Sequence, residues 1–95
     1  MRHLFIVNPA AGKRGTTPQL EALLEKLTFP HEVVYTQQEG DARRFTQEAA
    51  RSGEPVRIYA CGGDGTLNEV VNGAAGLSHV AVTNVPKGTG NDFLK

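Results

Sequence analysis

The chain has 95 residues, and its ten lysine and arginine residues balance ten aspartate and glutamate residues. This length predicts at most one small domain, and the zero net charge gives no basic field of the kind that marks nucleic-acid or membrane-surface binders. The single cysteine, Cys61, excludes an internal disulfide and fits a reducing compartment. The apolar stretch near the N-terminus stops at Asn8 and is shorter than a signal-peptide core, so we expect a cytoplasmic protein. From the balanced charge we expect no nucleic-acid partner.

The first half of the chain is predicted to contain two strands, each followed by a helix. The apolar run 4–7 is typical of a buried strand. Thr17 is expected to cap the first helix. The β-branched run 32–36 predicts the second strand. Asp41 is expected to cap a second helix, which ends at Gly53.

The second half repeats this alternation. Residues 56–61 and 79–85 are predicted strands, and the helix between them is expected to begin at Thr66 and to end at Gly76. Thr66 and Glu69 match the Ser/Thr-x-x-Glu capping box, in which each side chain bonds an N–H group near the helix start. The order of elements predicts an α/β fold: a three-layer parallel sheet with helices on both faces.

A glycine-rich corner, Gly62-Gly63-Asp64-Gly65-Thr66, joins the third predicted strand to the third helix. Glycines there let an anion approach the backbone N–H groups at a helix N-terminus; a bare tight turn is the alternative interpretation. Two other glycine loops, at 8–15 and 86–92, also follow predicted strands. Ligands of such sheets bind beyond the carboxyl ends of the strands, so the three loops together predict a phosphate-binding site.

Two common phosphate-binding patterns do not fit this sequence. A Walker loop needs Gly-Lys followed by Ser or Thr, but Gly12-Lys13 is followed by Arg14. The first glycine of that pattern would fall at residue 7, which is valine. The dinucleotide pattern Gly-x-Gly-x-x-Gly fails because Asn68 stands at the third glycine position. A different kind of phosphate cradle is therefore expected.

Three segments resemble the N-terminal motifs of the diacylglycerol kinase catalytic domain, a family that includes bacterial lipid kinases, sphingosine kinases and ceramide kinases. They are NPAAG at 8–12, GGDGTLNE at 62–69 and PKGTGNDF at 86–93. Thr36 with the GDA segment at 40–42 also resembles the family's region after the second strand. The resemblance covers essentially the whole chain. It implies ATP bound with Mg²⁺, and transfer of the γ-phosphate to a hydroxyl of diacylglycerol or a related lipid.

Roles follow for individual residues. Asp64 is the expected catalytic residue, since a carboxylate there suits acceptance of the lipid hydroxyl proton or organisation of Mg²⁺; alternatively, it only orders the turn. No metal ligand is assigned. The expected nucleotide-binding residues are polar or glycine positions of the loops: Asn8, Gly12, Thr36, Gly62, Gly63, Gly65, Thr66, Asn68, Gly88 and Thr89. The three histidines, at the strand starts, are expected to be surface residues at the edge opposite the loops.

The resemblance further implies that residues 1–95 are the N-terminal, ATP-binding part of a catalytic domain whose β-rich C-terminal domain is absent. Such a chain is expected to be inactive alone, and membrane contact is expected only through the missing part. An uncovered sheet edge would permit a homodimer through strand pairing. A stand-alone nucleotide-binding module and an NAD kinase, which shares Gly-Gly-Asp-Gly-Thr, are the alternative interpretations; the 8–9 and 88–93 segments favour the lipid kinase.

Overall fold

Four parallel strands form the central sheet of the computed structural model, which describes residues 1–9 and 17–85. Within these residues the elements are β1 (Arg2–Val7), α1 (Thr17–Glu25), β2 (Glu32–Tyr35), α2 (Asp41–Ala50), β3 (Val56–Cys61), α3 (Asp64–Ala74) and β4 (Val80–Val85). The strand order is β2-β1-β3-β4, and every neighbouring pair is parallel. The α/β fold predicted from the sequence is confirmed, and the third strand has the predicted bounds.

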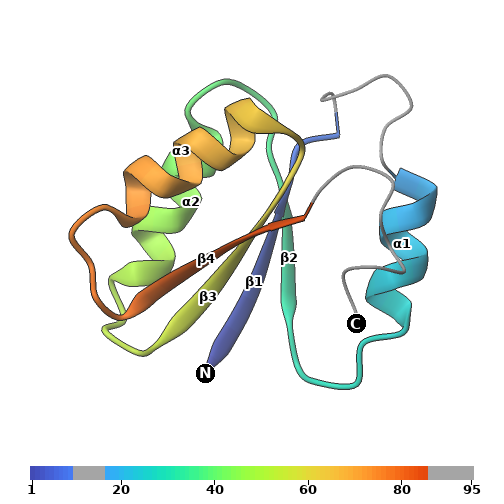
Figure 1. Ribbon diagram of the computed structural model, residues 1–95, viewed down its shortest axis with the longest axis horizontal. Helices are drawn as coiled ribbons and strands as arrows, with labels where there is room; N and C mark the ends of the chain where they lie inside the picture. Colours follow the sequence, from blue (N-terminus) through green and yellow to red (C-terminus); the bar gives the residue numbers. More distant parts are fainter. Residues whose placement is uncertain (10–16, 86–95) are drawn as a thin grey trace.

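Helices cover both faces of this sheet, with α1 on one face and α2 and α3 on the other (Figure 1). Because side chains alternate along a strand, Leu4 and Ile6 of β1 belong to the core beneath α2 and α3. Phe5 and Val7 belong to the core beneath α1, which contributes Leu20. Residues 4–7 of β1, which are buried on both faces of the sheet, therefore form an unbroken apolar run rather than an alternating one.

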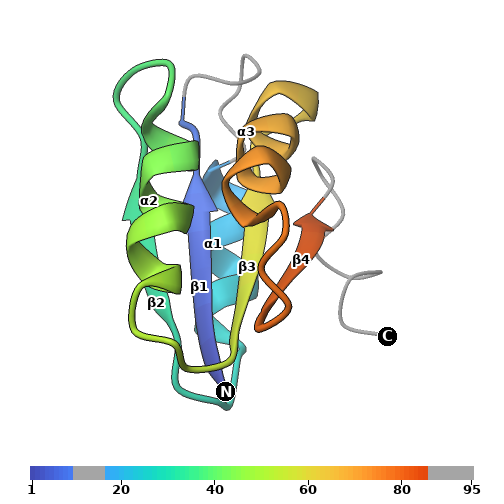
Figure 2. The ribbon, with the colours of Figure 1, turned by 90° about the vertical axis from the view of Figure 1, so that its left-hand side faces the viewer.

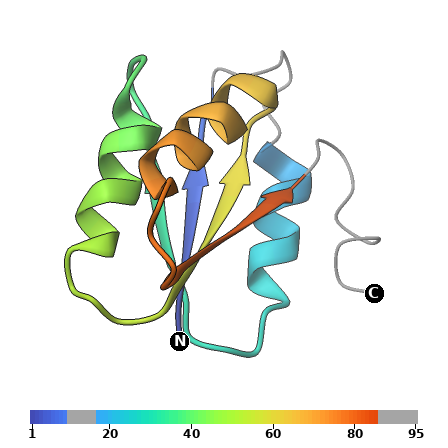
Figure 3. The ribbon, with the colours of Figure 1, turned by 60° about the vertical axis from the view of Figure 1, so that its left-hand side comes forward.

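The chain changes direction across the sheet after β2. The first crossover places β2 on one side of β1, and the second returns across β1 to place β3 on its other side. All strands run the same way, so their carboxyl ends gather at one edge, the upper edge in Figure 3. The point between β1 and β3 is the topological switch point at which ligands of such sheets bind.

Two helices begin differently from the prediction. α3 begins at Asp64, two residues before the expected start, and it has no side-chain cap. The prediction of a capping box was wrong, because the carboxylate of Glu69 accepts N–H groups at the start of α2 rather than those of its own helix. The prediction that Asp41 caps α2 was also wrong: Gly40 holds the cap position without a side-chain bond, and Asp41 is the first helical residue. Thr17, the predicted cap of α1, is the first residue of that helix, and β1 begins two residues before its predicted start. The helices α2 and α3 end three and two residues before the glycines predicted to end them, and the other strand ends differ by at most one residue.

The helices α2 and α3 lie side by side over the sheet (Figure 2). Their close approach depends on Gly73, since a Cβ atom there would lie 2.9 Å from the Arg43 carbonyl oxygen and 3.0 Å from Thr46 Cβ. A glycine inside a helix usually destabilises it, so this one is explained by the space that α2 occupies. None of the helices among the described residues is long and apolar enough to cross a membrane.

The histidines lie at the amino-terminal side of the sheet, but they are more than surface residues. His3 Nδ1 is 2.8 Å from the Tyr59 hydroxyl, His31 Nδ1 is 3.0 Å from the Phe29 carbonyl oxygen, and all three histidines are half-buried. Cys61 is buried, and burial raises the pKa of its thiol to about 12. Cys61 is therefore a packing residue.

Candidate functional site

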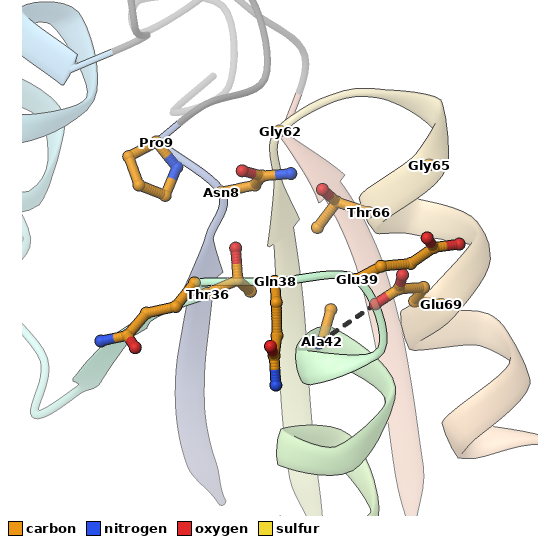
Figure 4. Close-up of a pocket in the computed structure, with 11 residues that line it drawn as sticks. Asn8, Pro9, Thr36, Gln38, Glu39, Ala42, Gly62, Gly65, Thr66 and Glu69 are labelled. Atoms are coloured by element: carbon orange, nitrogen blue, oxygen red, sulfur yellow. Dashed lines mark hydrogen bonds between the residues drawn. The ribbon is translucent and has the colours of Figure 1, made fainter.

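A cavity of about 770 Å³ opens at the carboxyl edge of the sheet (Figure 4). Its volume lies in the range of small-molecule sites, roughly 300–1,000 Å³. It is lined by residues that follow β1, β2 and β3, by the first turn of α2 and by the first two turns of α3: Asn8, Pro9, Thr36, Gln37, Gln38, Glu39, Ala42, Gly62, Gly65, Thr66 and Glu69. The cavity thus lies where the sheet topology favours a ligand.

Backbone hydrogen bonds beyond the strands hold two of these residues in place. The Asn8 N–H donates to the Cys61 carbonyl oxygen at 2.9 Å, which continues the β1–β3 ladder past Val7. The Thr36 N–H donates to the Val7 carbonyl oxygen at 2.9 Å, which continues the β1–β2 ladder. The backbones of these two residues are therefore held by the sheet itself, at the ends of the neighbouring strands β1 and β2.

Gly62 is a glycine because protein atoms occupy the space beside it. A Cβ atom at this position would lie 2.7 Å from Thr66 Oγ1 and 2.8 Å from Asn8 Cβ. Figure 4 shows the Asn8 and Thr66 side chains pointing toward one another beside Gly62. The missing side chain therefore lets the ends of β1 and β3 and the start of α3 meet.

Gly63 and Gly65 differ from Gly62 and from each other. Gly63 has a φ of 103°, in the region that favours glycine, so the turn into α3 accounts for it. Gly65 lies in the first turn of α3, is exposed, and lines the cavity; a Cβ atom there would have no neighbour within 4 Å among residues 1–9 and 17–85. Alanine is more favourable than glycine within a helix by up to ~1 kcal/mol. The fold of the described residues therefore gives no reason for glycine at position 65.

The N-terminus of α3 presents backbone donors at the cavity. Leu67 bonds back to the Gly63 carbonyl oxygen at 3.0 Å, as the helical ladder begins. The N–H groups of the preceding turn, which includes Gly65 and Thr66, have no carbonyl partner within a helix, and the helix dipole adds partial positive charge there. This end of the cavity is suited to an anion.

The remaining predicted site residues are placed as follows. Asp64 is exposed in the first turn of α3, and Asn68 is exposed one turn later; neither lines the cavity, nor does Gly63. Gly12, Gly88 and Thr89 lie outside the described residues. The structure therefore brings Asn8, Thr36, Gly62, Gly65 and Thr66 together at one cavity.

The β2–α2 segment, residues 36–40, supplies a wall of the cavity that the sequence analysis largely missed. Only its first residue, Thr36, was a candidate, whereas Gln37, Gln38 and Glu39 also line the cavity. No motif of glycines marks these three side chains. The signal available was topological: β2 neighbours β1, so its carboxyl end had to lie beside Asn8.

Two carboxylates bond the backbone of this wall. Asp41 Oδ2 accepts the N–H groups of Gln37 at 2.8 Å and Gln38 at 3.2 Å. These bonds, the one from Gln37 above all, and the bond that Asp41 Oδ1 accepts from the Arg44 guanidinium at 3.2 Å hold the pKa of the Asp41 carboxyl below its usual value, against the opposing effect of burial. Glu69 reaches from α3 and accepts the N–H groups of Gly40 at 3.0 Å and Ala42 at 3.1 Å; Figure 4 shows its side chain extending toward Ala42.

The acidic residues near the cavity bear on a possible Mg²⁺ ion. In the part of the chain that the structure describes, no group of three or more His, Cys, Asp or Glu side chains could hold a metal. Magnesium at phosphoryl-transfer sites usually takes one or two carboxylates and completes its shell with phosphates and water. Asp64 and Glu39 are exposed carboxylates of this kind. The described residues therefore fit magnesium only as an ion shared with bound phosphates.

The sheet topology defines a doubly wound α/β protein, and the cavity lies at its switch point, where ligands of such folds bind. The chain matches the model of the diacylglycerol kinase catalytic domain over residues 2–95, and it belongs to that family. The resemblance inferred from its three motifs is confirmed.

Relatives in sequence and in structure agree with this assignment. A diacylglycerol kinase of Staphylococcus saprophyticus is 43% identical over 98 residues, covering 97% of this chain and 31% of the relative. A diacylglycerol kinase of Bacillus subtilis is 39% identical, covering 99% of this chain and 32% of the relative. The crystal structure of a diacylglycerol kinase from Bacillus anthracis superposes with a TM-score of 0.62 and 33% identity, covering 97% of this chain and 35% of the other. The chain thus spans about a third of the length of these relatives.

Proposed function

We propose that residues 1–95 are the N-terminal, ATP-binding part of a lipid kinase that transfers the γ-phosphate of ATP to a hydroxyl of diacylglycerol or a related lipid. Membership of the family and the cavity at the switch point support this function. The single observation that carries the binding of a phosphate is Gly65, an exposed first-turn glycine beside the cavity where a Cβ atom would meet none of the described residues within 4 Å. A ligand that approaches the α3 backbone accounts for it.

In this proposal the phosphates lie at the N-terminus of α3, and the rest of the nucleotide lies toward the β2–α2 segment. The N–H groups of the first turn and the helix dipole stabilise the phosphate charge. The side chains of Asn8 and Thr36 line the cavity between the two walls and are suited to orient the nucleotide. The cavity volume of about 770 Å³ accommodates a ligand of this size.

Asp64 is proposed as the catalytic residue. It lies in the first turn of α3, next to Gly65, and is exposed, so a substrate can reach its carboxylate. There it would accept the proton of the lipid hydroxyl or take part in holding Mg²⁺. The metal ion, when bound, neutralises charge on the phosphates.

Titration calorimetry of the chain with ATP and Mg²⁺ tests the binding. We expect the wild-type chain to bind and Gly65→Ala to raise the dissociation constant about tenfold or more, a difference of ~1.4 kcal/mol. The same variant should unfold at an equal or higher urea concentration, since alanine favours the helix. Asn72→Ala, an exposed position at the other end of α3, is the matched control and should bind like the wild type.

Two results would contradict the binding proposal: no heat of binding at millimolar ATP, or an unchanged affinity in Gly65→Ala. The transfer reaction is tested separately, with the complete protein that carries this chain and diacylglycerol in mixed micelles. Asp64→Asn should lower kcat at least a hundredfold while leaving the ATP affinity within a few-fold. A near-normal kcat would remove Asp64 from the reaction, and phosphorylation of NAD but of no lipid would assign the protein to NAD kinase chemistry.

A further inference from the structure

Two helix N-termini border the cavity, and they differ in what already bonds them. The first turn of α3, with Gly65 and Thr66, lines the cavity and has no side-chain cap. The first turn of α2 lines it through Ala42, but its N–H groups already meet a carboxylate, that of Glu69. The position suited to an anion at α2 is therefore filled by the protein, whereas at α3 no side chain of the described residues fills it.

The carboxylate of Glu69 acts together with that of Asp41. Glu69 uses one oxygen for the Gly40 N–H and the other for the Ala42 N–H. Asp41 uses a single oxygen for the N–H groups of Gln37 and Gln38. Four backbone donors of the β2–α2 segment and the adjoining first turn of α2 are thus bonded by two side chains. Bonds to charged acceptors are stronger than neutral ones, so the two carboxylates fix the conformation of this wall.

We propose that Glu69 and Asp41 are positioning residues of the nucleotide site: they hold the β2–α2 segment in the shape that receives the nucleoside, and Glu69 keeps the phosphates away from α2 and directs them to α3. This inference rests on the proposed function, because it concerns how the same cavity binds ATP. Neither residue needs to touch the nucleotide; each acts through the backbone that it bonds.

The bonding pattern predicts opposite tolerance at the two positions. Asp41→Asn keeps a carbonyl oxygen that can accept both N–H groups, since both donate to one oxygen. Its amide nitrogen replaces Oδ1 and gives up only the ion pair with Arg44, whose side chain is exposed and can turn away. Glu69→Gln cannot keep both of its bonds, because the N–H groups donate to different oxygens and the amide nitrogen would face one of them. Replacing the carboxylate by the corresponding amide should therefore change the affinity for ATP little at position 41 and lower it strongly at position 69.

The test compares the binding of ATP with that of inorganic tripolyphosphate, both with Mg²⁺, by titration calorimetry. Glu69→Gln and Asp41→Ala should raise the dissociation constant for ATP about tenfold and leave that for tripolyphosphate within about twofold. Asp41→Asn should bind both ligands like the wild type. Glu54→Gln, an exposed glutamate before β3, is the matched control and should change neither. In Glu69→Gln the amide protons of Gly40 and Ala42 should also exchange faster, as followed by NMR.

Several outcomes would overturn the inference. One is an unchanged affinity for ATP in Glu69→Gln and Asp41→Ala. Another is an equal loss of affinity for ATP and for tripolyphosphate, which a general loss of structure would produce. A wild-type chain that binds ATP but not tripolyphosphate would refute the placement of the phosphates at α3. A wild-type chain that binds neither ligand refutes the proposed function and this inference with it. If circular dichroism shows that Glu69→Gln does not fold, the two Asp41 variants test the inference instead. Equal affinities for ATP in Asp41→Ala and Asp41→Asn would then overturn it.

Discussion

Replacing Gly62 by alanine tests whether the junction beside the cavity is as tight as it looks. The new Cβ atom would lie 2.7 Å from Thr66 Oγ1 and 2.8 Å from Asn8 Cβ, whereas ordinary contacts begin at 3.4 Å. Thr66 is buried, and Asn8 Cβ is fixed to the end of β1, so neither atom moves freely. Backbone or rotamer shifts of several tenths of an ångström are needed, and such overpacking costs ~1–3 kcal/mol.

This cost is large relative to the total stability of a small domain, ~5–15 kcal/mol. Since ~1 kcal/mol lowers the melting temperature of a domain of this size by roughly 4–8 °C, we expect Gly62→Ala to melt ~5–20 °C below the wild type. Circular dichroism at 222 nm measures the transition, and urea unfolding gives the free energy. Gly65→Ala, three residues along the chain, adds a Cβ atom that contacts none of the described residues; it is the control and should not lose stability.

A melting temperature of Gly62→Ala within about 2 °C of the wild type would refute this reasoning. The double variant with Thr66→Ala sharpens the test. Removal of Thr66 Oγ1 relieves the closer of the two contacts and leaves the one to Asn8. A double-mutant cycle should therefore show partial recovery, with a coupling free energy of ~0.5–3 kcal/mol, the range of directly contacting residues.

Three further predictions concern the core and the β2–α2 segment. Because its bonds hold the pKa of Asp41 below the usual value, its carboxylate contributes stability above pH ~4, and this contribution is lost as the pH falls through the folded-state pKa. The difference in urea unfolding free energy between wild type and Asp41→Ala should shrink as the pH is lowered from 7 to 3. A difference that stays constant would contradict a contribution from the Asp41 carboxylate. Gly73→Ala should destabilise the chain by ~1–3 kcal/mol because α2 lies against it, and a stabilised variant would show that the two helices can separate. The Cys61 thiol, with its pKa raised to about 12, should react with a disulfide reagent at pH 8 at least ~100-fold more slowly in the folded chain than in urea; equal rates would refute burial.

The sequence by itself determined the layers of the fold and the edge at which the site lies. Apolar runs without alternation indicated strands buried on both faces, and the β3 bounds, Val56–Cys61, agree with the prediction. Right-handed crossovers then required parallel strands with a common carboxyl edge. These features are local or follow from general rules of topology, which is why the motifs at 8–12 and 62–66 were recognised as parts of one site.

The tertiary structure alone decided which groups meet at that edge. Glu69 matched a local capping box, yet its carboxylate bonds Gly40 and Ala42, which lie 29 and 27 residues away. Gly62 matched a phosphate loop, yet its missing side chain is explained by Asn8 and Thr66. Periodicity and propensity describe neighbours along the chain, whereas a hydrogen-bond acceptor takes the donors that packing brings within reach. For this reason the sequence predicted a site at the ends of the strands, and only the packing of α3 against α2 decided how its walls are held.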